Sequence, residues 1–135
     1  MNIKIKGELI NFDEPKVMGI LNLTPNSFYD GGKFNTVENA LKKTDQMIKE
    51  GAFFIDIGSC STKPGVKIIS ENEEKKRLLP VLENLIKVFP DNYFSIDTFR
   101  SKIASEALEM GASMINDISS EFEYRDKRHF MPKLR

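Results

Sequence analysis

Two segments of the chain repeat one layout, and this repetition limits the folds that the sequence can adopt. At residues 51–57 and again at 111–116, a helical pattern stops at glycine, alanine follows, and an apolar run meets a polar residue. Apolar strands that alternate with helices are typical of a parallel sheet covered by helices. The sequence therefore predicts an α/β fold.

The periodicity predicts a short hairpin that turns at Gly7, followed by strand–helix units. We expect strands at residues 17–23, 53–57, 93–96 and 114–118, and helices at residues 37–50 and 100–110. A further helix is expected after Ser70, with an apolar face that extends to Phe89. Thr36 is expected to cap the first helix, and Ser70 with Glu73 forms a capping-box pattern before the second. Pro80 is expected to bend or interrupt that second helix.

The predicted strands end in polar side chains, which are Asn22, Asp56, Asp97 and Asn116. In (β/α)8 barrels the active site lies at the carboxyl ends of the strands. We therefore expect the N-terminal half of a (β/α)8 TIM-type barrel, with about four parallel strands and covering helices after the hairpin. A doubly wound sheet also fits the pattern, but the sequence has no Gly-x-Gly-x-x-Gly or Walker loop.

The first buried strand runs into a long polar segment, and residues 19–32 include Thr-Pro-Asn-Ser and Asp-Gly-Gly. Asn22 offers a hard oxygen for a cation such as Mg²⁺ and an N–H group for a phosphate. An ordinary strand-to-turn transition, in which Asn22 bonds to local backbone, explains the same residues.

Composition excludes several classes of protein. The 20 basic and 20 acidic residues balance, and no basic stripe indicates nucleic-acid binding. No apolar run approaches the roughly 20 residues of a membrane span, and the alternation in residues 1–6 is typical of a strand rather than a signal peptide. A single cysteine, Cys60, cannot form an internal disulfide. We expect a cytoplasmic protein that binds neither nucleic acid nor membranes.

Four sequence blocks occur in a recognisable order at residues 19–32, 56–65, 95–100 and 111–118. The second reads Asp-Ile-Gly-Ser-Cys-Ser-Thr-Lys-Pro-Gly, the third Ser-Ile-Asp-Thr-Phe-Arg, and the fourth Gly-Ala-Ser-Met-Ile-Asn-Asp-Ile. Together they resemble the signatures of the dihydropteroate synthases, folate-pathway enzymes that bind a pterin diphosphate. The resemblance covers about residues 15–120.

The resemblance implies a transferase that condenses 6-hydroxymethyl-7,8-dihydropterin diphosphate with p-aminobenzoate, giving dihydropteroate and diphosphate, with Mg²⁺ as cofactor. It places Asp97 and Asn116 on the pterin edge, and Asn22 on the diphosphate and Mg²⁺. A helix cap for the segment that begins at residue 98 is the alternative role of Asp97.

The resemblance also assigns roles to two loops. Thr62 would contact the pterin and Lys63 the diphosphate, while Asp56 would orient the second loop. Phe28 and Pro64 would help to wall the p-aminobenzoate slot, and they suit equally well as apolar anchors of the loops. The family usually has arginine at position 63, and lysine lacks the bidentate fork that suits a phosphate.

Other residues that the family uses, an aspartate, a lysine and an arginine with a histidine, have no counterpart here. We therefore expect residues 1–120 to form a partial pterin-binding barrel domain that is inactive alone. Residues 121–135 lack any period and are expected to be a disordered tail. Homo-oligomer formation is compatible with the sequence.

Two other functions remain open from the sequence. One is a pterin-binding methyltransferase domain, a barrel relative that also uses an aspartate and an asparagine at strand ends. The segments at residues 24–32 and 61–65 favour the synthase, because a methyl donor has no diphosphate to bind. The other is a truncated product without catalytic activity.

Overall fold

The computed structural model describes residues 2–23, 36–59 and 68–116. In chain order, the elements of these residues are β1 (Asn2–Ile5), β2 (Glu8–Asn11), β3 (Val17–Asn22), α1 (Thr36–Lys49), β4 (Ala52–Gly58), α2 (Glu71–Val88), β5 (Tyr93–Asp97), α3 (Ser101–Met110) and β6 (Met114–Asn116). The hairpin, the strands and the helices that the sequence predicts are all present. The helix α1 includes Thr36, which we expected to precede it as a cap.

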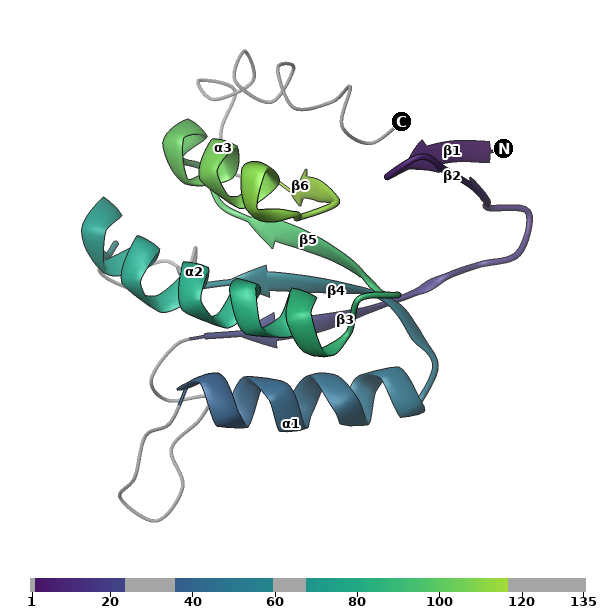
Figure 1. The fold of residues 1–135 in the computed structure, drawn as a ribbon, viewed down its shortest axis with the longest axis horizontal. Coiled ribbons are helices and arrows are strands. Elements are labelled where there is room, and N and C mark those ends of the chain that lie inside the picture. The colour runs from purple at the N-terminus through teal and green to yellow at the C-terminus, as the bar shows by residue number, and fades with distance from the viewer. Residues whose placement is uncertain (1, 24–35, 60–67, 117–135) are drawn as a thin grey trace.

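The main sheet has four parallel strands in the order β3-β4-β5-β6, which is also their order along the chain. The helices α1, α2 and α3 lie together on one side of this sheet (Figure 1). A doubly wound sheet would place helices on both sides and reverse its strand order at a switch point. The expected partial (β/α)8 barrel is therefore confirmed, and the doubly wound alternative is wrong.

Residues alternate between the two faces of the sheet. The face that meets the helices carries a large apolar core, which includes Leu21, Ile55, Ile57, Phe94 and Ile96. The intervening residues of each strand point to the opposite face, because successive side chains of a strand alternate. This opposite face, which we call the inner face, carries the polar residues at the strand ends.

The antiparallel hairpin β1–β2 packs near the amino ends of the main strands. Its turn residues Lys6 and Gly7 both have positive φ, at 51° and 82°, as a two-residue hairpin turn of type I′ requires. Ile5 and Ile10 join Phe54 and Tyr93 in a second apolar cluster. The Tyr93 hydroxyl donates to Glu8 Oε2 at 2.5 Å. This hydrogen bond, with burial, raises the pKa of Tyr93 to about 12.

The helix α2 begins with the predicted cap, because Ser70 Oγ accepts from the Glu73 amide at 3.1 Å. The expected interruption at Pro80 does not occur, and α2 is continuous over 18 residues. Proline cannot donate a hydrogen bond to the carbonyl of Lys76. Both Pro80 and Lys76 are exposed, so water can solvate that carbonyl and the helix continues.

Among the described residues, no helix has both the length and the apolar character needed to cross a membrane. The end of the predicted fourth strand, at residues 117–118, lies outside the described residues, as does the predicted tail at 121–135.

Candidate functional site

The strand ends bring three predicted site residues into one row. Asn22 of β3 pairs with Gly58 of β4, Gly58 pairs with Asp97 of β5, and Asp97 pairs with Asn116 of β6. Neighbouring strands lie about 4.8 Å apart, so the side chains of this row stand next to one another on the inner face. The row combines a carboxylate with two amides at the carboxyl edge of the sheet, where barrel enzymes bind their substrates.

Gly58 leaves space for the Asp97 side chain. A Cβ atom at position 58 would lie 3.3 Å from Asp97 Cβ and 3.4 Å from Asp97 Oδ2. The first separation is tighter than an ordinary contact, and the second is at the lower edge of the ordinary range. The glycine in the middle of the row therefore sets where the Asp97 carboxylate can lie.

Under the pterin-binding role that the sequence resemblance implies for Asp97, we expect Gly58→Ala to weaken pterin binding about tenfold, because the new methyl group displaces the Asp97 carboxylate by a few tenths of an ångström. A fluorescence titration with a pterin measures the effect. Asp91→Ala, at an exposed position that precedes β5, is a control away from the row. Equal pterin affinity in parent and Gly58→Ala proteins would show that the carboxylate tolerates the displacement.

A second polar layer lies directly beneath the row. Asp56 and Ser95 pair with each other across β4 and β5, and both are almost fully buried, at 4% and 0% exposure. Asn116 Nδ2 donates to Asp56 Oδ2 at 3.4 Å. Asp56 thus holds the amide of Asn116 from below, and its predicted effect on residues 60–67 lies outside the described residues.

Burial raises the pKa of the Asp56 carboxyl above its usual value of 3.8, and the side chains of Ser95 and Asn116 oppose this in part. Among the described residues, Asp56 Oδ1 and Ser95 Oγ are buried and neither has a hydrogen bond of ordinary geometry, so Ser95 acts on Asp56 as a nearby hydroxyl rather than through a formed bond. A polar atom in this condition disfavours folding unless water or a ligand satisfies it.

The raised pKa predicts how stability depends on pH. The folded protein binds the Asp56 proton more tightly than the unfolded chain does. The charged carboxyl therefore does not lower the free energy of unfolding below the unfolded pKa, and it lowers this free energy increasingly as the pH rises through the folded pKa. Asp56→Asn removes this charge and keeps an oxygen for Asn116. We expect the variant to gain free energy of unfolding relative to the parent as the pH rises above about 4, the usual pKa of an aspartate in an unfolded chain. Urea unfolding at several pH values measures the difference, which would stay constant if Asp56 titrated normally.

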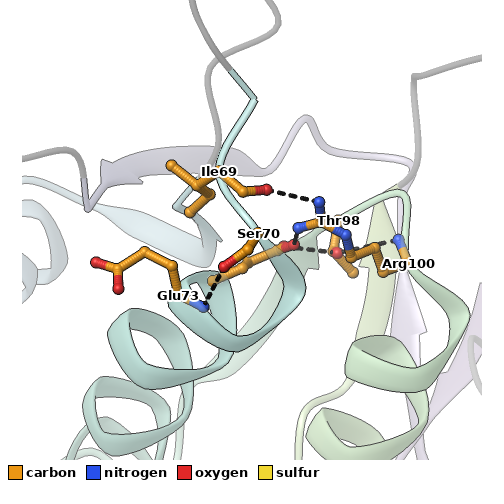
Figure 2. Close-up of polar contacts among 6 residues, drawn as sticks. Ile69, Ser70, Glu73, Thr98 and Arg100 are labelled. Atoms are coloured by element: carbon orange, nitrogen blue, oxygen red, sulfur yellow. Dashed lines mark hydrogen bonds and ion pairs between the residues drawn. The ribbon is translucent and has the colours of Figure 1, made fainter.

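A separate polar cluster lies beside the row, between α2 and the turn that follows β5 (Figure 2). The Glu74 side chain is completely buried and binds Arg100 Nη1 through Oε1 at 2.6 Å. Its other oxygen, Oε2, accepts from the Thr98 hydroxyl at 2.7 Å. Arg100 Nη2 donates to the backbone carbonyl of Ile69 at 2.6 Å.

Sequence reasoning missed this cluster, although one signal was present. Glu74 belongs to the same helical stripe as Leu78, Leu82 and Leu85, which are buried. A carboxylate in an apolar stripe requires a partner of opposite charge. The sequence alone could not identify that partner as Arg100.

Several predicted site residues lie outside the described residues: Phe28, Thr62, Lys63 and Pro64. Within residues 2–23, 36–59 and 68–116, no three His, Cys, Asp or Glu side chains are grouped to hold a metal ion.

The chain matches the family described as "Pterin binding enzyme" over residues 18–132. It belongs to this pterin-binding enzyme family. Known members are identical to it at nearly half of the aligned positions. The dihydropteroate synthase of Staphylococcus haemolyticus is 49% identical over 102 residues, which are 76% of this chain and 38% of that protein. The Clostridium beijerinckii synthase is 47% identical over 117 residues, which are 86% of this chain and 43% of that protein.

Solved structures of pterin-binding enzymes share the fold. Dihydropteroate synthase from Xanthomonas albilineans, solved with 4-aminobenzoic acid, superposes with a TM-score of 0.83 at 37% identity over 93% of this chain and 47% of that one. The Yersinia pestis enzyme in complex with a sulfonamide drug has a TM-score of 0.80 at 39% identity, over 96% of this chain and 48% of that one. The chain spans less than half the length of these relatives.

Proposed function

We propose that this chain forms the pterin-binding part of a dihydropteroate synthase. The proposed reaction joins 6-hydroxymethyl-7,8-dihydropterin diphosphate to p-aminobenzoate and releases diphosphate. The observation that carries this proposal is the row of Asn22, Asp97 and Asn116 at the carboxyl edge of the sheet. The many dihydropteroate synthases among its relatives support it.

The chemistry of the row suits a pterin. The 2-amino-4-oxo edge of a pterin presents two neighbouring N–H groups, and a carboxylate can accept both. Asp97 takes this role in the proposal. Asn116 lies beside it and offers both a donor and an acceptor for adjacent ring positions. The amide orientation of Asn116 is held by Asp56.

The diphosphate would lie toward the β3 end of the row. In the reaction, the amine nitrogen of p-aminobenzoate bonds to the pterin methylene carbon as the C–O bond to diphosphate breaks. The electron pair leaves with the diphosphate, and the amine loses a proton. Negative charge grows on the leaving group, so positive charge near it favours the transition state.

Asn22 fits the role of a Mg²⁺ ligand in this proposal. It is exposed at the carboxyl end of β3, and its amide carries a hard oxygen. Magnesium sites at phosphates typically use one or two protein ligands together with phosphate oxygens, so a large cluster of acidic residues is not required. Bound Mg²⁺ supplies positive charge to the leaving diphosphate.

The proposal also includes residues from the loops. Thr62 contacts the pterin, Lys63 contacts the diphosphate, and Phe28 and Pro64 line the slot for p-aminobenzoate. These assignments are based on the resemblance of residues 19–32 and 56–65 to the synthase signatures.

A chimeric protein tests the proposal. In it, residues 18–116 replace the matching segment of the Bacillus subtilis dihydropteroate synthase, which is 49% identical to this chain over 102 residues. We expect the chimera to form dihydropteroate from labelled p-aminobenzoate and the pterin diphosphate, and no product from the pterin alcohol that lacks diphosphate. A folded chimera that binds pterin without consuming p-aminobenzoate would contradict synthase function and favour the methyltransferase alternative.

A further inference from the structure

We propose that Arg100 is a positioning residue for the pterin carboxylate Asp97, and this role rests on the function proposed above. Asp97 is the last residue of β5, so the sheet fixes the chain before it but not the chain after it. The turn that follows, at residues 98–100, is held by the polar cluster around Glu74. Figure 2 shows Arg100 reaching from this turn toward Ile69 and the first turn of α2.

Three kinds of contact anchor the turn. The Arg100 guanidinium binds Glu74 Oε1 and the Ile69 carbonyl, both at 2.6 Å. Thr98 donates its hydroxyl proton to Glu74 Oε2, and the same hydroxyl accepts from the Arg100 amide at 3.2 Å. The guanidinium also lies 4.6 Å from the ring centroid of Phe99. Every residue of the turn thus takes part in the network that ends on α2.

The planar guanidinium suits this task in a way that an ammonium does not. Its nitrogen atoms form a rigid fork, so one side chain bonds a carboxylate and a backbone carbonyl at the same time. Lysine at position 100 would keep the charge beside Glu74 but lose the fixed geometry of the two contacts. Arg100→Lys therefore separates the effect of the positive charge from the effect of the fixed contact geometry.

The helix α2 also supplies a matched control, through an ion pair with α3. Lys75 Nζ binds Glu106 Oε1 at 3.0 Å and so joins α2 to α3. Within the described residues, the ion pair of Lys75 and Glu106 includes no atom of the turn after Asp97. Loss of this second ion pair tests what weaker helix pairing alone does to pterin binding.

The test measures pterin affinity of the 135-residue chain by fluorescence titration, with the folded fraction checked by circular dichroism. The variants are Arg100→Lys, which keeps the charge, and the double variant Glu74→Gln/Arg100→Met, which removes both buried charges. The control is Lys75→Met/Glu106→Gln. We expect pterin to bind about tenfold more weakly to each of the first two proteins, and within about twofold of the parent to the control.

The outcomes separate the two proposals. Folded Arg100 variants that bind pterin as the parent does would overturn the positioning role alone. If the cluster served stability only, a folded Arg100→Lys protein would bind pterin with the affinity of the parent. This result too would overturn the positioning role. A parent chain that does not bind pterin would overturn the proposed function, and the role of Arg100 with it.

Discussion

Asp97→Ala is expected to abolish measurable pterin binding. The carboxylate is the only acidic side chain of the row, and the pterin edge would leave two N–H groups without an acceptor. The expected loss is roughly 3 kcal/mol or more, which corresponds to over a hundredfold in Kd. Calorimetry or fluorescence titration with a pterin measures it.

Two further variants test whether the lost pterin affinity is specific to the Asp97 carboxylate. Asp91→Ala removes an exposed aspartate that precedes β5 and should leave the affinity unchanged. Asp97→Asn keeps the shape and one acceptor, but its NH2 group opposes the pterin donors, so we expect an affinity close to that of Asp97→Ala. Near-parental affinity in Asp97→Ala would show that the pterin binds elsewhere.

Arg100→Met is expected to cause the largest loss of stability, about 3–5 kcal/mol in the free energy of unfolding. Glu74 is completely buried, and the substitution leaves its carboxylate without the opposite charge. Lys75→Met breaks a more exposed ion pair, with side-chain exposures of 44% and 30%. Urea unfolding should therefore show a loss of at most about 1 kcal/mol for that control.

Restoring charge balance provides a check on this explanation. Glu74→Gln/Arg100→Met should recover most of the stability lost in Arg100→Met, because it removes the uncompensated charge. If the double variant were as unstable as the single one, packing and the Ile69 contact would account for the loss rather than charge.

The sequence predicted the strands and the polar residues at their ends because both are local patterns. A strand of apolar residues that ends in Asp or Asn can be identified without knowing its neighbours, and the parallel order then brings these ends together. Asn22, Asp97 and Asn116 were identified in this way, and the structure places them in one row.

The second layer and the cluster at Arg100 depend on contacts that no local pattern specifies. The Glu74–Arg100 pair joins residues of two different helical units, and the contact between Asp56 and Asn116 crosses the sheet. Pro80 shows the opposite limit, because the helix is not interrupted there although a strong local rule allows for it, and the affected turn is exposed to solvent.

Along β4 and β5, residues that stabilise the core alternate with residues that face the proposed binding site. Ile55, Ile57 and Ile96 pack into the core on the helix side, whereas Asp56 and Asp97 lie between or beside them on the inner face. In a saturation scan of these strands, substitutions should lower protein abundance at one position and ligand affinity at the next. This alternation with a period of two residues would distinguish variants that weaken ligand binding from variants that destabilise the fold.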